Sequence, residues 1–175
     1  MKIGIIGSGK IGGTLARLWA KAGNQVALSH SRGPESLAGQ VAAIGNGAQA
    51  MTVEDAAAFG DVILLAIPLN QYRTLPADRL AGKIVIDAMN YYPSRDGEMA
   101  GMADNSSRVV AQYLNGSRLV KAFNSLNYQP LGTEGRPSAP LDDRLVIYVA
   151  GDDPSAVATV ENLVKEIGFA PVATG

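Results

Sequence analysis

Residues 1–15, MKIGIIGSGKIGGTL, decide the fold of this 175-residue chain. Residues 2–6 form a short, mostly apolar run, and such a run predicts a buried strand. Apolar side chains then recur at helical spacing over residues 10–21, with Gly23 just beyond, so we predict a helix that ends there. The turn from strand to helix, residues 7–12, has the pattern G-x-G-x-x-G.

The three glycines of this turn favour a bound dinucleotide. Gly7 permits the tight turn, Gly9 lets the backbone approach a pyrophosphate, and Gly12 lets the helix pack closely on the strand. Free N–H groups at the positive end of the helix dipole suit a phosphate. A glycine-rich turn without a ligand is the alternative, and the combination of strand, spacing and helix favours dinucleotide binding.

The rest of the chain repeats this alternation of strand and helix. Continuous apolar runs, such as DVILLAI and KIVIDA, are typical of parallel strands buried on both faces. We therefore predict a single α/β domain over residues 1–175: a doubly wound, mainly parallel Rossmann sheet with helices on both faces. The predicted strands cover residues 2–6, 25–29, 49–52, 61–67, 83–88, 118–122, 145–150 and 170–172, and the predicted helices cover residues 10–21, 34–44, 53–59, 105–114 and 154–167.

Two segments rich in glycine and proline fit no regular element. They are residues 90–104 and 129–143, and each follows a predicted strand. Open α/β sheets bind ligands at the carboxyl ends of their strands. We therefore expect both segments to lie beside the site.

Composition excludes several classes of site. The chain has no cysteine and one histidine, His30, which excludes disulfides, thiolate metal sites, cysteine nucleophiles and multi-histidine zinc sites. We predict no metal site. A net charge of −1 leaves no basic excess for nucleic acid or an anionic membrane. The N-terminal apolar run is too short for a signal peptide, and no run reaches about 18 apolar residues, so we expect a cytoplasmic protein.

The end of the second predicted strand indicates which dinucleotide binds. NAD enzymes usually carry Asp or Glu there for the ribose 2′-hydroxyl, whereas this chain reads SHSRG at residues 29–33. Arg32 offers a charged fork and Ser31 a hydroxyl to a 2′-phosphate, and one such hydrogen bond gives a preference of roughly ten- to hundredfold. NADP(H) is thus favoured over NAD(H), with a solvated loop arginine as the alternative. His30 lies at this adenosine end, where it either faces solvent or neighbours the 2′-phosphate, so we assign it no part in hydride transfer.

Three further strand ends supply candidate site residues. Ile67-Pro68 is either a strand stop or the surface beneath the ribose and nicotinamide. Asn90 could donate to a carboxamide or a ribose, and Asn124 points to the same edge.

Other residues near these ends have structural interpretations. Asp87 is expected to cap a neighbouring loop, and Phe123 is expected in the core. No catalytic residue is assigned, although Tyr91, Arg95 and Asp96 remain open as proton donors.

These stretches resemble the F420-dependent NADP oxidoreductase family, which includes NADPH:coenzyme F420 reductases and the nucleotide domain of transmembrane ferric reductases. The resemblance rests on IGIIGSGKIGGTLA, the Ser31-Arg32-Gly33 turn, DVILLAIP, GKIVIDAMNYYP, RLVKAFN and VAGDDPSA, in order over nearly the whole chain. Family members often carry a further basic residue after the serine–arginine pair, where this chain has Gly33-Pro34. Selectivity for a 2′-phosphate would therefore rest more on Arg32.

The resemblance also implies a site and an assembly. A homodimer is the assembly it implies. It implies NADP(H) contacts from Gly7, Ser8, Gly9, Lys10, Ile11, Gly12, Ser31, Arg32, Ile67, Pro68, Asn90, Ala122 and Asn124.

Motif and resemblance together predict an NADP(H)-dependent oxidoreductase. Hydride would pass between NADPH and a small-molecule acceptor, either the deazaflavin coenzyme F420 or a flavin such as FMN or FAD. One alternative is an NADPH-binding sensor or regulatory module without turnover. Another is a reductase of a small metabolite, although such enzymes normally add a helical C-terminal domain that 175 residues do not accommodate.

Overall fold

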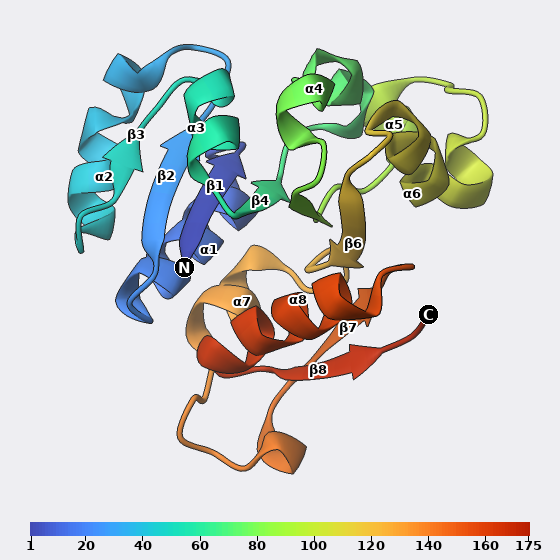
Figure 1. Ribbon diagram of the computed structural model, residues 1–175. Helices are drawn as coiled ribbons and strands as arrows, with labels where there is room; N and C mark the ends of the chain where they lie inside the picture. The colour runs from blue at the N-terminus through green and yellow to red at the C-terminus, as the bar shows by residue number, and fades with distance from the viewer.

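The computed structural model describes residues 1–175 and has one sheet of eight strands. Strands β1 to β6 are all parallel, which confirms the predicted doubly wound, mainly parallel α/β fold. In sheet order the strands are β3 (Gln49–Ala50), β2 (Gln25–Ser29), β1 (Lys2–Ile6), β4 (Val62–Leu65), β5 (Ile84–Asp87), β6 (Arg118–Ala122), β7 (Val146–Ala150) and β8 (Ala170–Ala173) (Figure 1).

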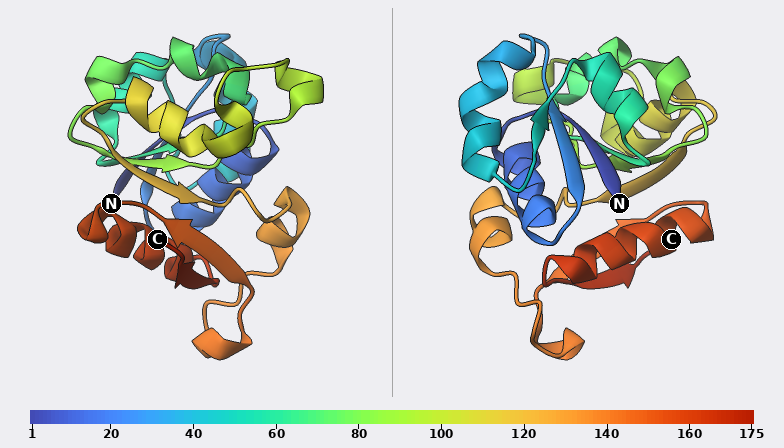
Figure 2. Two further views of the ribbon diagram at one scale, coloured as in Figure 1. Left: turned by 90° about the vertical axis from the view of Figure 1, so that its right-hand side faces the viewer. Right: turned by 60° about the vertical axis from the view of Figure 1, so that its left-hand side comes forward.

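Helices cover both faces of the sheet, as Figure 2 shows in its left-hand view. None of these helices has the length and apolar character that crossing a membrane requires. One layer consists of α1 (Lys10–Lys21), η1 (Pro34–Leu37), α2 (Ala38–Ile44), α7 (Tyr128–Thr133) and α8 (Pro154–Glu166). The other consists of α3 (Val53–Phe59), η2 (Leu69–Thr74), α4 (Ala77–Leu80), α5 (Pro93–Asp96) and α6 (Met102–Tyr113).

The two layers explain why the central strands are apolar throughout. Side chains alternate between the faces of a strand, so Ile5 packs in the core with α1 and α8 while Ile6 packs in the core on the opposite face. Trp19 joins distant parts of the first core. Its ring meets Phe123 edge-on at 5.7 Å, and its indole N–H donates to the carbonyl of Leu163 at 3.1 Å. Phe123 therefore lies in the core as predicted.

The last two strands depart from the parallel order. β7 runs antiparallel to β6, with Val149 opposite Ala122, so β7 begins beyond the end of β6. β8 then pairs parallel to β7. The connection before β7 includes η3 (Leu141–Asp143) and extends away from the body of the molecule (Figure 2). The expectation that all of residues 129–143 flank the sheet edge is thus wrong for its second half.

Short helices account for most of the other differences. Residues 69–80 contain η2 and α4, and the segments predicted to be irregular contain α5 and α7. Each of these helices has four to six residues, too few for apolar side chains to repeat at helical spacing. The predicted helix over 34–44 is divided into η1 and α2.

Polar side chains cap the starts of three helices. Thr52 accepts a hydrogen bond from the N–H of Asp55 at 3.1 Å, and Asp153 accepts from two N–H groups at the start of α8. Helix α6 begins at Met102, earlier than predicted. Asn105 interrupts it with a non-helical backbone (φ −157°, ψ 89°) and accepts from the N–H of Arg108 at 3.0 Å, so it caps the longer part.

Candidate functional site

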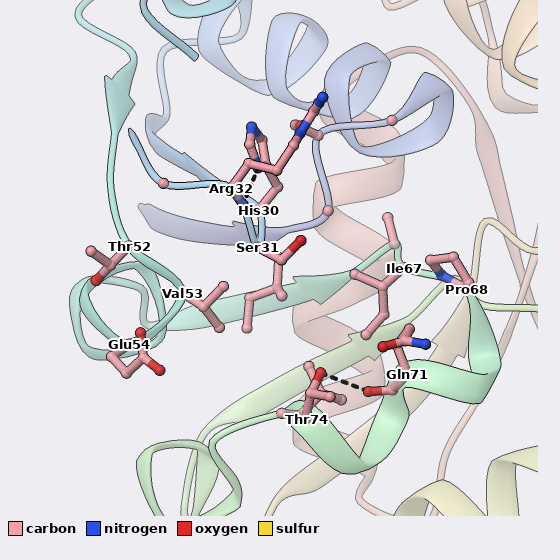
Figure 3. Close-up of a pocket in the computed structure, with 17 residues that line it drawn as sticks. His30, Ser31, Arg32, Thr52, Val53, Glu54, Ile67, Pro68, Gln71 and Thr74 are labelled. Atoms are coloured by element: carbon pink, nitrogen blue, oxygen red, sulfur yellow. Dashed lines mark hydrogen bonds between the residues drawn. The ribbon is translucent and has the colours of Figure 1, made fainter. Parts of the chain in front are cut away.

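A pocket of about 690 Å³ lies where the strand order reverses, between β1 and β4. Open α/β sheets bind ligands at such a reversal. Figure 3 shows Thr52 and Glu54, at the start of α3, across the pocket from Pro68 and Gln71. Seven predicted site residues line it: Gly7, Ser8, Gly9, Ser31, Arg32, Ile67 and Pro68.

Two glycines of the β1–α1 turn are required by close packing. Gly7 has a left-handed backbone (φ +114°), and a Cβ on it would overlap the carbonyl of Ala66. A Cβ on Gly12 would overlap the carbonyl oxygen of Gly7. Gly12 is buried, and its role is therefore packing of helix on turn, as the motif predicts.

Gly9 differs from its two neighbours. A Cβ on Gly9 would meet no atom of the chain within 4 Å, so packing gives no reason for glycine at this position. Gly9 lines the pocket, and the space that a side chain would fill is where a pyrophosphate would approach the backbone. The turn therefore fits a dinucleotide.

The backbone of this turn also offers unused hydrogen-bond donors. The N–H groups from Ser8 to Gly12 donate no hydrogen bond within the chain, whereas Gly7 donates to Ser29 and Gly13 donates to Gly9. The first N–H groups of a helix lack intrahelical partners and carry its positive partial charge. Five consecutive free donors at the start of α1 are therefore suited to a phosphate group.

The β2–η1 turn, residues 30–36, carries the positive charge of the pocket. Ser31 and Arg32 are exposed, and the Arg32 guanidinium forms no hydrogen bond or ion pair with the chain. His30 lies beside it in the pocket wall (Figure 3). Partial burial, and secondly the Arg32 charge, hold the pKa of His30 below its usual range. The pocket thus offers an uncommitted cation beside a neutral imidazole.

Two further sides of the pocket are formed by residues that the sequence did not indicate. Gln71 and Thr74 belong to η2, which was not predicted, and so no local signal marked them. Thr52, Val53 and Glu54 follow β3 with only Met51 between. The rule that ligands lie at carboxyl ends of strands could have identified these three residues.

The remaining predicted residues lie outside the pocket. Lys10 turns toward α7, with Nζ 4.6 Å from the centroid of the Tyr128 ring, and Ile11 is half-buried against the core. Asn90 and Asn124 lie together, because the Asn90 side-chain amide donates to the Asn124 carbonyl at 2.7 Å. Ala122 has no exposed surface. The structure thus brings Asn90 and Asn124 together but keeps Ala122 in the core.

A buried ion pair sits beneath the loop that carries Asn90. Asp87 accepts from Lys121 Nζ at 3.1 Å and from the N–H of Met89 at 2.9 Å, and Lys121 also donates to the Met89 carbonyl. Burial raises the pKa of Asp87, although the nearby Lys121 charge acts in the opposite direction. The interpretation of Asp87 as a cap for a neighbouring loop is confirmed.

The three residues left open as proton donors are engaged within this loop. Arg95 pairs with Asp96 at 2.7 Å, and this contact holds the pKa of Asp96 below its usual range. The Tyr91 hydroxyl donates to the carbonyl of Gly97 at 2.7 Å. None of them lines the pocket, and neither do the segments 90–104 and 129–143.

Comparison with known proteins assigns the chain to a family. Residues 2–91 match the family model described as NADP oxidoreductase, coenzyme F420-dependent. The chain is 30% identical over 176 residues to metalloreductase STEAP3 of Rattus norvegicus, covering 99% of this chain and 34% of that protein. It therefore spans about a third of the length of that curated relative.

Solved structures share the whole fold. A hypothetical protein from Sinorhizobium meliloti is 29% identical with a TM-score of 0.81, and the match covers 99% of this chain and 83% of that one. A protein from Arthrobacter sp. FB24, provisionally assigned as an F420-dependent NADP reductase, is 23% identical with a TM-score of 0.82 and the same coverage. The family model covers more than half of the chain, and the chain belongs to the coenzyme F420-dependent NADP oxidoreductase family, a family of NAD(P)-dependent oxidoreductases.

Proposed function

We propose that this chain binds NADP(H) in preference to NAD(H) and catalyses hydride transfer between NADPH and a deazaflavin or flavin acceptor. One observation carries the proposal: Ser8 and Gly9, the first two of the five free N–H donors at the start of α1, line the same pocket as Arg32 with its uncommitted guanidinium. The first feature suits a pyrophosphate and the second suits a 2′-phosphate.

The charges of the pocket support the choice of cofactor. Its ionisable side chains are His30, Arg32 and Glu54. Arg32 can offer a planar, bidentate fork to a phosphate. No carboxylate stands at the end of β2, where NAD enzymes usually hold the ribose 2′-hydroxyl. A 2′-phosphate there would meet a cation and no opposing carboxylate at that strand end.

The family and the pocket chemistry support the choice of acceptor. A bound nicotinamide supplies the hydride, so the protein has to hold two rings together and exclude water between them. The wall formed by Ile67, Pro68, Gln71 and Thr74 contains no acid or base. A deazaflavin or flavin can take its proton from solvent, so such a wall is sufficient. The family description and the assignment of the Arthrobacter protein both name F420.

The test follows NADPH oxidation by the purified chain without oxygen. Parallel reactions contain coenzyme F420, FMN, FMN with ferric citrate, a small ketone, a small imine, or no acceptor, and NADH replaces NADPH as the control donor. The ferric arm is included because the rat relative is named a metalloreductase. We expect transfer to F420 or FMN, with NADH slower by about tenfold or more.

Other outcomes would overturn parts of the proposal. Equal rates with NADH and NADPH would reject the role of Arg32 in selecting the cofactor. Tight NADPH binding with no turnover in any arm would reject the enzyme in favour of a sensor. Turnover with a small ketone or imine, and none with flavins, would identify a reductase of small metabolites.

A further inference from the structure

The β2–η1 turn is closed by one side chain, His30. The N–H of Arg32 donates to His30 Nδ1 at 2.8 Å, and His30 Nε2 lies 3.0 Å from Ser36 Oγ. Residues 30–33 form no hydrogen bond between backbone groups. The imidazole ring therefore links the start of the turn to its end.

The hydrogen bonds define the state of the ring. Nδ1 accepts from a backbone N–H, so it carries no proton. The single hydroxyl hydrogen of Ser36 is donated to the Gly33 carbonyl at 2.8 Å. Ser36 Oγ must therefore accept from Nε2–H, and the ring is the neutral Nε2–H tautomer.

This arrangement orients the residues that face the ligand. Arg32 and Ser31 are exposed, so packing does not hold their backbone, and the bond from the Arg32 N–H to the ring is what fixes it. A bidentate contact to phosphate needs the guanidinium fork in one orientation. The side chain of His30 is thus in a position to set that orientation without touching the phosphate.

We propose that His30 is a positioning residue that determines specificity: through its bond to the Arg32 N–H it sets the preference of the pocket for a 2′-phosphorylated adenosine. This inference rests on the proposed function, because it assumes that Arg32 recognises a 2′-phosphate. It assigns the only histidine of the chain to cofactor selection and gives it no part in hydride transfer.

The test uses two nucleotides that differ only in the 2′-phosphate, adenosine 2′,5′-bisphosphate and 5′-AMP. Their affinities for the full chain are measured by calorimetry, and the quantity of interest is the ratio between them. We expect His30→Ala to lower the ratio about tenfold, because one backbone hydrogen bond is lost. His30→Asn should keep most of the ratio, since Asn Oδ1 can accept from the N–H two residues on.

Two further variants separate the two contacts of the ring. His30→Gln reaches toward Ser36 and lacks an acceptor at the position of Nδ1, so it should resemble His30→Ala. Ser36→Ala keeps the bond to Arg32 and removes the second anchor, so it should lie between wild type and His30→Ala. Thermal unfolding of each variant checks that the fold is intact.

The outcomes separate this inference from the proposed function. If the wild type binds both nucleotides equally, the proposed cofactor preference fails, and the inference fails with it. A second outcome would reject only the inference about His30. In that outcome the wild type prefers the bisphosphate, Arg32→Gln abolishes this preference, and His30→Ala retains it. If Ala and Asn at position 30 lose the preference equally, the ring contacts the phosphate directly and positioning through Arg32 is rejected.

Discussion

Two turns border the same pocket and are held in different ways. In the β1–α1 turn, Gly7 and Gly12 lie against carbonyl groups and leave no room for a side chain. In the β2–η1 turn, residues 30–33 lack hydrogen bonds between backbone groups, and the side chains of His30 and Ser36 hold the shape.

Because of this difference, we expect the β1–α1 turn to bind the part that NADH and NADPH share, and the β2–η1 turn to distinguish the two cofactors. The backbone-held turn presents N–H groups to any pyrophosphate, so it should serve NADH and NADPH alike. The turn held by side chains presents Arg32 to the one group that distinguishes them. Substitutions in the first turn should therefore affect the fold or both cofactors, and those in the second should affect one cofactor.

The largest expected effect is on the fold, from Gly12→Ala. The new Cβ would overlap the Gly7 carbonyl, and we expect a loss of about 3 kcal/mol in the free energy of unfolding, which lowers Tm by roughly 6–12 °C. Gly39→Ala is the matched control, because Gly39 is an exposed residue of α2 and a Cβ there meets nothing within 4 Å. Alanine should stabilise that position by up to about 1 kcal/mol. Equal melting temperatures for the two variants would contradict the steric explanation.

Gly9→Ala should break binding and leave the fold intact. Its Cβ points into the space where a pyrophosphate would approach, so we expect about a hundredfold weaker binding of both NADPH and NADH. The free energy of unfolding should stay within about 0.5 kcal/mol of wild type. Titration by cofactor fluorescence gives both affinities, and unchanged binding would exclude the turn as the pyrophosphate site.

Arg32→Gln should weaken binding of NADPH alone, by about tenfold, because an exposed charge-assisted hydrogen bond is lost. NADH affinity should not change. Arg79→Gln on α4 removes the same charge outside the pocket and should leave both affinities unaltered. An equal loss for NADPH and NADH would assign Arg32 to general electrostatic attraction.

The smallest expected effect is a pH dependence of stability. The pKa of His30 in the folded chain lies below its usual range, so on acidification the unfolded chain takes up a proton at a higher pH than the folded chain does. This contribution is complete above about pH 6.5 and is lost as the pH falls toward the lower folded pKa. Arg32 opposes protonation, while Glu35 and Glu54 are the carboxylates of the turn and the pocket wall.

Chemical denaturation of wild type and His30→Asn, compared at neutral and mildly acid pH, measures this contribution of His30 to the free energy of unfolding. The difference in unfolding free energy between the two proteins should shrink on acidification. A difference that grows would mean that the folded state favours the protonated imidazole.

Local sequence patterns predicted most of the fold. They failed where a helix was short and where the direction of a strand depended on a distant segment. The apolar runs that became β4 and β5 were recognised because strands buried on both faces need apolar side chains throughout. Helices η2 and α4 were missed, since a helix of four to six residues is too short for its apolar side chains to repeat at helical spacing. The antiparallel direction of β7 was not predicted, because it depends on pairing with β6 and not on the residues of β7.

The candidate site divides in a similar way. Gly7, Gly9 and Arg32 were identified from spacing alone, and the structure places them around one pocket. Asn90 and Asn124 were expected to face a ligand, whereas the Asn90 amide is engaged with the Asn124 carbonyl. Gln71 could not have been identified, because its element was not predicted.

The sequence by itself determined the parallel sheet, the glycine turn and the absence of a carboxylate at the end of β2. These features depend on residue type and on spacing within a few positions, and both can be read directly. Only the tertiary structure decided which strand ends share the pocket, that the Ser8–Gly12 donors stay free, and that His30 closes the turn beside Arg32. Those features depend on side-chain orientation and on contacts between distant segments, which no local pattern specifies.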